Sequence, residues 1–237
     1  MVQQHTIRWD IKYKILVSIT GLLVIVALTV FPPTVTGDFS WRKTVIGLVF
    51  SIFCSSGVLA VFSPSNCGKI IEGKKQSVIS DSSSAPKEAV VLLGHHPTCG
   101  KFFAHTFQIG NKTFCAACIG LLLGGLLALV GTVGYFFCNW NITGHSVTIV
   151  LLGVFGIVFG LFQFKFNKVF RLFANTVFVL GALLILIGID ELIHSLFFDL
   201  FVVSVIAFWL FTRISLSQVD HELICSGCEA ANCSVRA

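Results

Sequence analysis

Cysteine and histidine residues gather in two parts of this 237-residue chain. The first group consists of His95, His96, Cys99, His105, Cys115 and Cys118. A C-x-x-C or H-x-x-C pair places two ligands on one tight turn, and two such turns joined by a hairpin form a tetrahedral zinc site. The four expected ligands are His96, Cys99, Cys115 and Cys118. Because spacing alone does not choose within such a group, His95 or His105 can replace one member.

A second group lies near the end of the chain. Its members are His221, Cys225, Cys228 and Cys233. Since the topology argued below puts it on the same face as the first group, it either completes one shared site or holds a second metal.

The same cysteines allow other chemistry. Cys115 and Cys118 precede an apolar run, and a helix N-terminus lowers a thiol pKa, which favours a redox pair. Thiolates also hold iron or an iron–sulfur cluster, and a site that exchanges its ion suits a metal sensor or transporter. Buried, unreactive thiols are the simplest alternative. A structural zinc site remains the leading hypothesis, because the pairs have ligand spacing and lie outside the apolar runs.

The segment that carries the first group has its own expected structure. Residues 105–114 alternate in polarity around Gly110-Asn111, a dipeptide that favours a β-hairpin turn. The preceding stretch from Lys69 to Glu88 is polar and predicts a flexible tether. We therefore expect a linker over residues 66–89 and a small metal-binding knob over residues 90–118.

The rest of the composition indicates a membrane protein. Hydrophobic residues make up 55% and charged residues 11%, and the mean hydropathy is +0.91. Basic residues form no stripe with interleaved aromatics, which argues against nucleic acid. A span needs about 20 mainly apolar residues. The expected spans are Ile15–Phe31, Thr44–Phe62, Ile119–Phe137, Val147–Phe164, Leu172–Ile189 and Leu196–Thr212.

Basic residues are distributed unequally between the two sides of this arrangement. Of the 16 Lys and Arg residues, 14 fall in alternate segments on one side. Excess positive charge marks the cytoplasmic side. We therefore expect both termini and the Cys/His knob in the cytoplasm of a multi-pass protein of the cell membrane.

Two features within the spans have competing interpretations. Asp190, Glu191, His194 and Asp199 lie at the junction of the last two spans, where we expect a hairpin with a polar turn in water; the alternative is a cation or pH-sensing site. Spans three and four each contain a G-x-x-x-G motif, at Gly120/Gly124 and at Gly156/Gly160. These motifs favour packing within one chain over an oligomer, because they are common in apolar helices.

Residues 95–125 resemble a family of small prokaryotic membrane proteins of unknown function. The resemblance rests on the paired histidines, on Cys99, and on Cys115-x-x-Cys118-x-Gly120 at the start of an apolar helix. The commoner form has Cys-His at positions 95 and 96 and Arg-Cys-Thr-Gly at positions 117–120. The resemblance implies a metal-binding knob joined to a span and implies no reaction.

Together these features predict an all-α polytopic membrane protein of about six helices. Its parts are a first transmembrane hairpin over 1–65, the linker and knob, a four-helix region over 119–213, and a Cys-rich tail over 214–237. No Lys, Arg or Glu lies deep in an expected span, which argues against an ion pump. The chain contains no phosphate-binding glycine loop and no G-x-S-x-G or H-E-x-x-H motif. The leading hypothesis is a non-enzymatic protein with lipid around it and a protein partner at the knob.

Overall fold

The computed structural model describes residues 2–34, 39–62, 105–109, 112–140, 142, 144–163 and 167–226. Within these ranges the chain forms six helices, a π-helical turn and one two-stranded hairpin. The elements are, in chain order, α1(Val2–Val30), α2(Arg42–Phe62), β1(Thr106–Ile109), β2(Lys112–Cys115), α4(Ala116–Thr132), η2(Val133–Phe137), α5(Ser146–Leu161), α6(Lys168–Ile193) and α7(Leu196–Ser226).

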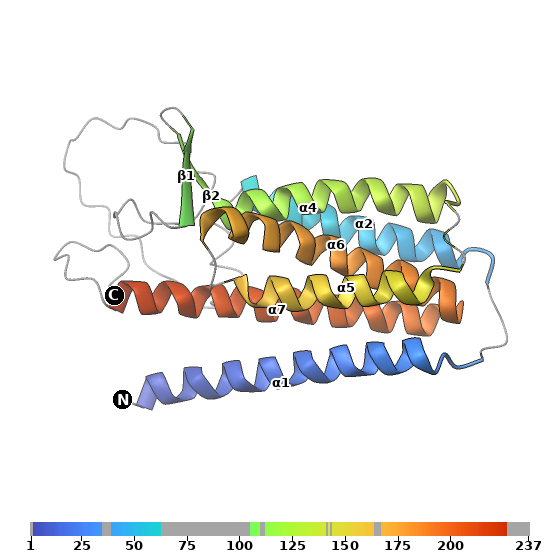
Figure 1. Ribbon diagram of the computed structural model, residues 1–237, viewed down its shortest axis with the longest axis horizontal. Coiled ribbons are helices and arrows are strands. Elements are labelled where there is room, and N and C mark those ends of the chain that lie inside the picture. Colours follow the sequence, from blue (N-terminus) through green and yellow to red (C-terminus); the bar gives the residue numbers. More distant parts are fainter. Residues whose placement is uncertain are drawn as a thin grey trace.

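The helices form an elongated bundle (Figure 1), and many large apolar side chains are exposed on its surface. All of the helices except α5 are long and apolar enough to cross a membrane, with η2 extending α4 to 22 residues. Helix α2 has 21 residues, which span about 31 Å at 1.5 Å per residue and match a hydrocarbon layer of about 30 Å. Large side chains such as Leu59, Val130 and Phe155 are more than 60% exposed on the surface, as suits contact with lipid.

The expected spans agree with the observed helices, with one difference in length. The fourth expected span corresponds to α5, which has 16 residues and measures only about 24 Å. It is therefore shorter than the other helices, although equally apolar.

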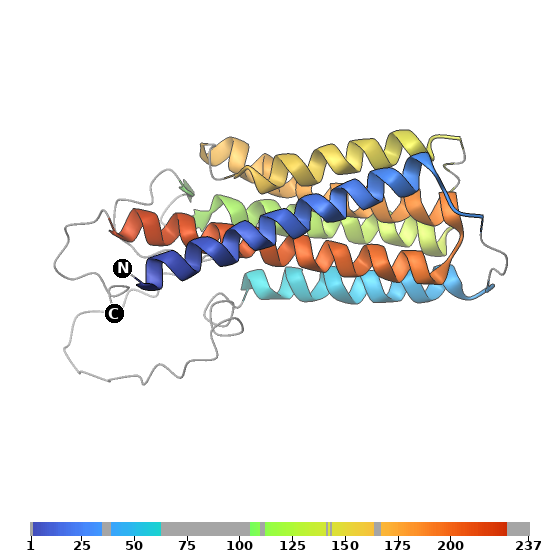
Figure 2. The same cartoon turned by 90° about the horizontal axis from the view of Figure 1, so that it is seen from below.

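The bundle has two distinct ends. The hairpin β1–β2, the start of α1 and the end of α7 lie at one end, which we call the hairpin end (Figures 1 and 2). The start of α2 and the connection from α6 to α7 lie at the other, which we call the Arg42 end. Successive helices therefore run in opposite directions along the bundle.

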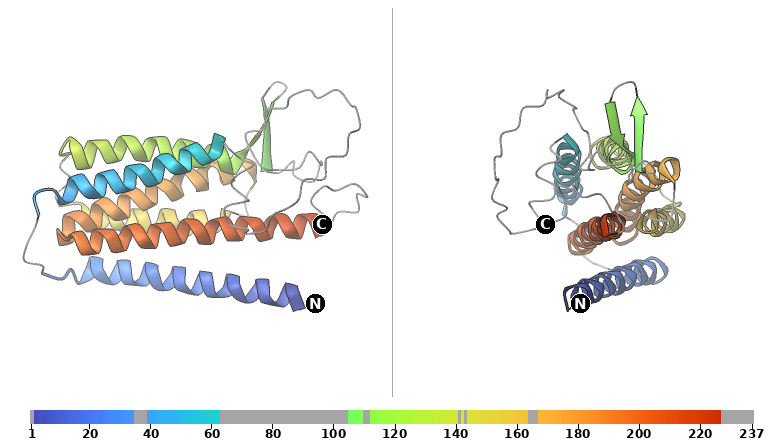
Figure 3. Two further views of the ribbon diagram at one scale, coloured as in Figure 1. Left: turned by 180° about the vertical axis from the view of Figure 1, so that it is seen from behind. Right: turned by 90° about the vertical axis from the view of Figure 1, so that its left-hand side faces the viewer.

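Helix α6 is the centre of the bundle. About two thirds of its span is buried (67%), against 33% or less for the other four long helices. The end-on view in Figure 3 shows α6 among α4, α5 and α7, with α1 at the edge beside α7. The core of the protein is therefore built around this one helix.

Glycines allow α4 and α5 to approach α6 closely. A Cβ on Gly124 would lie 3.0 Å from the Thr176 carbonyl oxygen, and one on Gly156 would lie 2.8 Å from that of Val177. Gly120 and Gly160 likewise face Leu172 and Phe178 of α6. Both G-x-x-x-G motifs thus serve packing within the chain, as the sequence favoured.

Helix α1 is attached mainly through α7. Ser18 Oγ donates to Thr212 Oγ1 at 3.0 Å, and Trp209 Nε1 donates to the Ser18 carbonyl oxygen at 3.1 Å. Nearer the hairpin end, Lys14 Nζ donates to Ser215 Oγ at 2.9 Å. Hydrogen bonds between spans are useful here because apolar side chains gain little from leaving lipid for another apolar surface.

The junction between α6 and α7 is a break, as predicted, and not a continuous helix. His194 adopts the left-handed conformation, with φ 53°, and its N–H donates to the Asp190 carbonyl oxygen at 3.1 Å. This conformation ends α6, and α7 begins two residues later. Helix α7 then continues to Ser226, so the first part of the Cys-rich tail is an extension of the last span.

The close approach of α5 to α6 leads to a testable prediction. Gly156→Ala should lower the free energy of unfolding by about 1–3 kcal/mol, because the new methyl group meets the backbone of α6. Gly57→Ala is the matched control, since a Cβ there has no atom within 4 Å, and alanine should raise helix stability by up to about 1 kcal/mol. Unfolding in detergent measures both. Equal effects of the two substitutions would contradict the assigned packing.

Candidate functional sites

The predicted hairpin is present, and it places one cysteine pair at its base. Strands β1 and β2 are antiparallel, with Thr106 paired with Cys115 and Ile109 paired with Lys112. Cys115 ends β2 and is buried, and Cys118 lies half-buried in the first turn of α4. The two cysteines therefore flank the junction between strand and helix, and His105 immediately precedes the residue paired with Cys115.

The remaining predicted ligands are only partly placed. His95, His96, Cys99, Cys228 and Cys233 lie outside the described residues. His221 and Cys225 belong to the last turns of α7, four residues apart. Within the described part of the chain, no three His, Cys, Asp or Glu residues form a group that could hold a metal. The zinc ligand set therefore stays a prediction.

His105 belongs to a buried ionic cluster that joins the hairpin to the bundle. Its Nδ1 lies 3.4 Å from Arg171 Nη1, and its Nε2 lies 4.0 Å from Asp220 Oδ2. Arg171 in turn donates to Asp220 Oδ2 from Nη1 and Nη2, at 3.2 and 3.3 Å. One arginine of α6 thus connects the start of the hairpin with the extension of α7.

A second arginine at the same end is buried among neutral acceptors. Arg213 of α7 donates from Nε to Asn175 Oδ1 at 2.6 Å and from Nη2 to Gln163 Oε1 at 3.3 Å. The Asn175 amide donates to the Arg171 carbonyl oxygen at 2.6 Å. These bonds link the end of α5, the first half of α6 and α7, which makes the base of the hairpin a fixed platform.

A third arginine forms the core of the Arg42 end. Arg42, in the first turn of α2, is 1% exposed and donates from Nη1 to the carboxylates of both Asp190 and Asp199. The bond to Asp199 Oδ2 is 2.7 Å long. Both carboxylates are fully buried. The guanidinium therefore joins α2 to α6 and α7 on either side of the turn between them.

The prediction of a polar turn in water is wrong for these two aspartates. The order of the helices brings Arg42 to the same end as the α6–α7 turn, and its guanidinium stabilises both carboxylates inside the protein. His194 alone of the four residues is exposed, while Glu191 is half-buried.

Tyr135, Glu191 and Lys43 extend the Arg42 cluster toward solvent. The Tyr135 hydroxyl lies 2.6 Å from Asp190 Oδ2 and 2.9 Å from Glu191 Oε2. Lys43 Nζ lies 3.9 Å from Glu191 Oε2 and 4.4 Å from the centre of the Tyr135 ring. The lysine thus adds an ion-pair and a cation–π contribution at the edge of the cluster.

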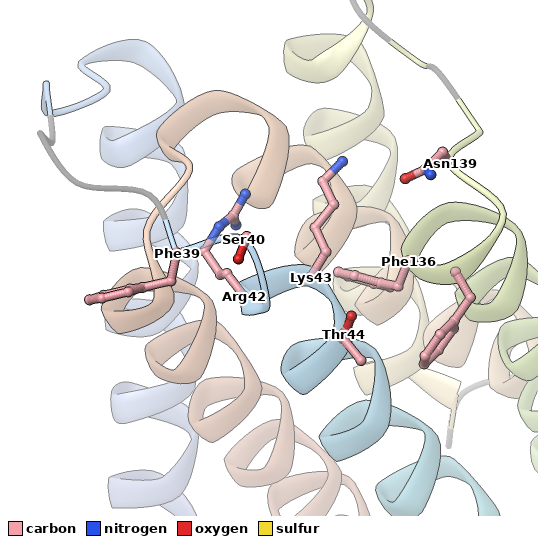
Figure 4. A pocket seen from close by; sticks show the side chains of 8 residues that line it. Phe39, Ser40, Arg42, Lys43, Thr44, Phe136 and Asn139 are labelled. Carbon is pink, nitrogen blue, oxygen red and sulfur yellow. The ribbon is translucent and has the colours of Figure 1, made fainter.

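A polar cavity of about 350 Å³ opens beside this cluster. Figure 4 shows Arg42, Lys43 and Thr44 on the first turn of α2, with Phe136 and Asn139 across from them. The complete lining is Phe39, Ser40, Arg42, Lys43, Thr44, Phe136, Phe137 and Asn139. The cavity therefore opens at the rim of an otherwise buried set of charges.

Sequence reasoning missed all three buried arginines. Arg42, Arg171 and Arg213 each lie within two residues of an expected span boundary, where basic residues indicate only the topology. The observed helices extend past those boundaries and enclose them. The signal that was available is charge pairing, because the expected topology already puts the acidic turn at the same end as Arg42.

Comparison with known proteins adds no further assignment. No family model, no curated protein and no solved structure matches the chain.

Proposed function

We propose that the chain is a multi-pass membrane protein whose hairpin end lies in the cytosol, holds a structural zinc ion and presents a fixed surface to a protein partner. The observation that carries the proposal is the placement of Cys115 and Cys118 on either side of the β2–α4 junction. Two thiolates at that spacing provide half of a tetrahedral zinc site.

Zinc explains how so small a module folds. A four-residue strand pair has too little apolar surface to be stable alone, whereas structural zinc supplies an apparent binding free energy of about 10–16 kcal/mol. In this proposal His96 and Cys99 complete the site. His105 acts instead as the anchor of the hairpin, because both of its ring nitrogens face Arg171 and Asp220.

The end of α7 supports a role for the tail near this site. Asp220 reaches the His105–Arg171 cluster, so the turn of α7 just before His221 lies against the base of the hairpin. Helix α7 therefore ends at the hairpin end of the bundle, and in this proposal Cys225 and Cys228 either share the zinc or hold a second ion.

The zinc content of the purified protein tests the site. Under reducing conditions in detergent, we expect about one zinc per chain, which the Cys115→Ser/Cys118→Ser variant loses. Cys138→Ser is the control that should keep it, because Cys138 is exposed just after η2, at the opposite end. Iron in place of zinc would favour a redox protein, and an absence of metal would contradict the proposal. Loss of zinc from Cys225→Ser/Cys228→Ser would place the tail in the site.

The orientation is tested by the accessibility of the same control residue. In the proposed topology Cys138 is the one cysteine exposed at the outer face, because Cys54 is buried within α2 and the other seven fall on the cytosolic side. A membrane-impermeant maleimide should label intact cells that express the protein, and Cys138→Ser should abolish this labelling, whereas Cys54→Ser should not. Labelling that survives Cys138→Ser, or that requires lysis, would contradict the orientation.

A further inference from the structure

The buried cluster at the Arg42 end contains more negative than positive groups. In the described part of the chain it combines the carboxyl groups of Asp190, Glu191 and Asp199 with the cations Arg42 and Lys43. Asp190 and Asp199 have no exposed surface. An uncompensated charge in such a place costs several kcal/mol, and a proton on one of the carboxyl groups would balance the charges of these described groups.

Asp199 is the carboxyl group at which such a proton would bind. Its Oδ2 accepts from Arg42, whereas its Oδ1 is buried and accepts a hydrogen bond from none of the described residues. A fully charged carboxylate would need a donor at both oxygens. The described acidic residues also form no group that could hold a metal ion, which makes a proton the better candidate than a metal cation.

We propose that Asp190 and Asp199 share one exchangeable proton, which makes the Arg42 end a proton-binding site. The two carboxyl groups are neighbours because both accept from the same nitrogen of Arg42. With one proton between them, the pair carries a single negative charge, which Arg42 balances. Glu191 and Lys43 then balance each other at the rim.

Tyr135 provides a route for this proton. Its hydroxyl contacts both the buried Asp190 and Glu191, whose side chain is 17% exposed. A hydroxyl has one proton to donate and can also accept one. When protonated Glu191 donates to the Tyr135 oxygen, the hydroxyl proton passes to Asp190 Oδ2. The tyrosine is regenerated, and the net change is one proton moved from the rim to the buried pair.

The surroundings of the pair restrict where the proton can enter. Lys43 of α2 lies 4.0 Å from Asp190 Oδ2, beside the cavity. His194 in the turn and His145 before α5 are exposed at this end. Helix α1 has no titratable side chain between Lys14 and its end at Val30. Among the described residues, the titratable groups therefore lead from the pair toward the Arg42 end, along Glu191 and Lys43.

Infrared spectroscopy tests the proposal, because the carbonyl stretch of a protonated carboxyl group is separate from that of a carboxylate. The full-length protein in lipid nanodiscs should show this signal at neutral pH, and the signal should shift in D2O. Asp199→Asn should remove it, and Asp190→Asn is a second variant in case the first does not fold. Glu191→Gln and the zinc-site variant Cys115→Ser/Cys118→Ser should both keep it, which separates this site from the proposed function.

A second measurement tests the proton route through Tyr135. Tyr135→Phe should keep the signal but slow its exchange in D2O by about tenfold or more, because a positioned proton carrier is lost. Tyr13→Phe is the matched control, since Tyr13 is the only other tyrosine and is 67% exposed on α1.

The proposal is overturned if the wild-type protein has no protonated-carboxyl signal at neutral pH, if Glu191→Gln removes this signal, or if its intensity follows the sodium concentration. An unchanged exchange rate in Tyr135→Phe overturns the proposed proton route through Tyr135.

Discussion

The ion pairs of Arg42 with Asp190 and Asp199 hold together the part of the structure that is least able to tolerate an unpaired charge. An arginine or an aspartate inside an apolar bundle is stable only when its charge is paired and its hydrogen-bonding groups are occupied. This single guanidinium connects the first turn of α2 with both helices that flank the α6–α7 turn. The turn itself can therefore be short, because the ion pairs fix the directions of the helices that it joins.

Buried arginines are paired with polar partners at both ends of the bundle, but the two arrangements differ. At the hairpin end, Arg171 and Arg213 bind a histidine, an aspartate and neutral amides, and they turn the ends of three helices into a platform for the hairpin. At the Arg42 end, the carboxyl groups of the described residues outnumber the cations, and a polar cavity opens nearby. The first arrangement suits a fixed surface, whereas the second suits a group that gains and loses a proton.

Much of the fold follows from local patterns in the sequence. Apolar length located the spans, Gly110-Asn111 located the hairpin, and glycine spacing located the close contacts of α4 and α5 with α6. What could not be predicted is how far each helix continues into polar sequence. That continuation depends on partners distant in the chain, such as Asp190 for Arg42, and local periodicity contains no information about them. For the same reason, neighbouring residues alone do not show whether His105 serves as a ligand or as an anchor.

The stability of charge-neutralised variants tests most directly whether paired charges hold the bundle together. Arg42→Gln should lower the free energy of unfolding in detergent by about 3–5 kcal/mol, because it leaves buried carboxyl groups without their cation. Adding Asp190→Asn and Asp199→Asn together should restore part of this loss, since the negative charge that the two carboxyl groups carry is then removed. A triple variant more stable than Arg42→Gln alone is the predicted result. If the aspartate substitutions only add to the loss caused by Arg42→Gln, the ion pairs do not have the structural role assigned to them.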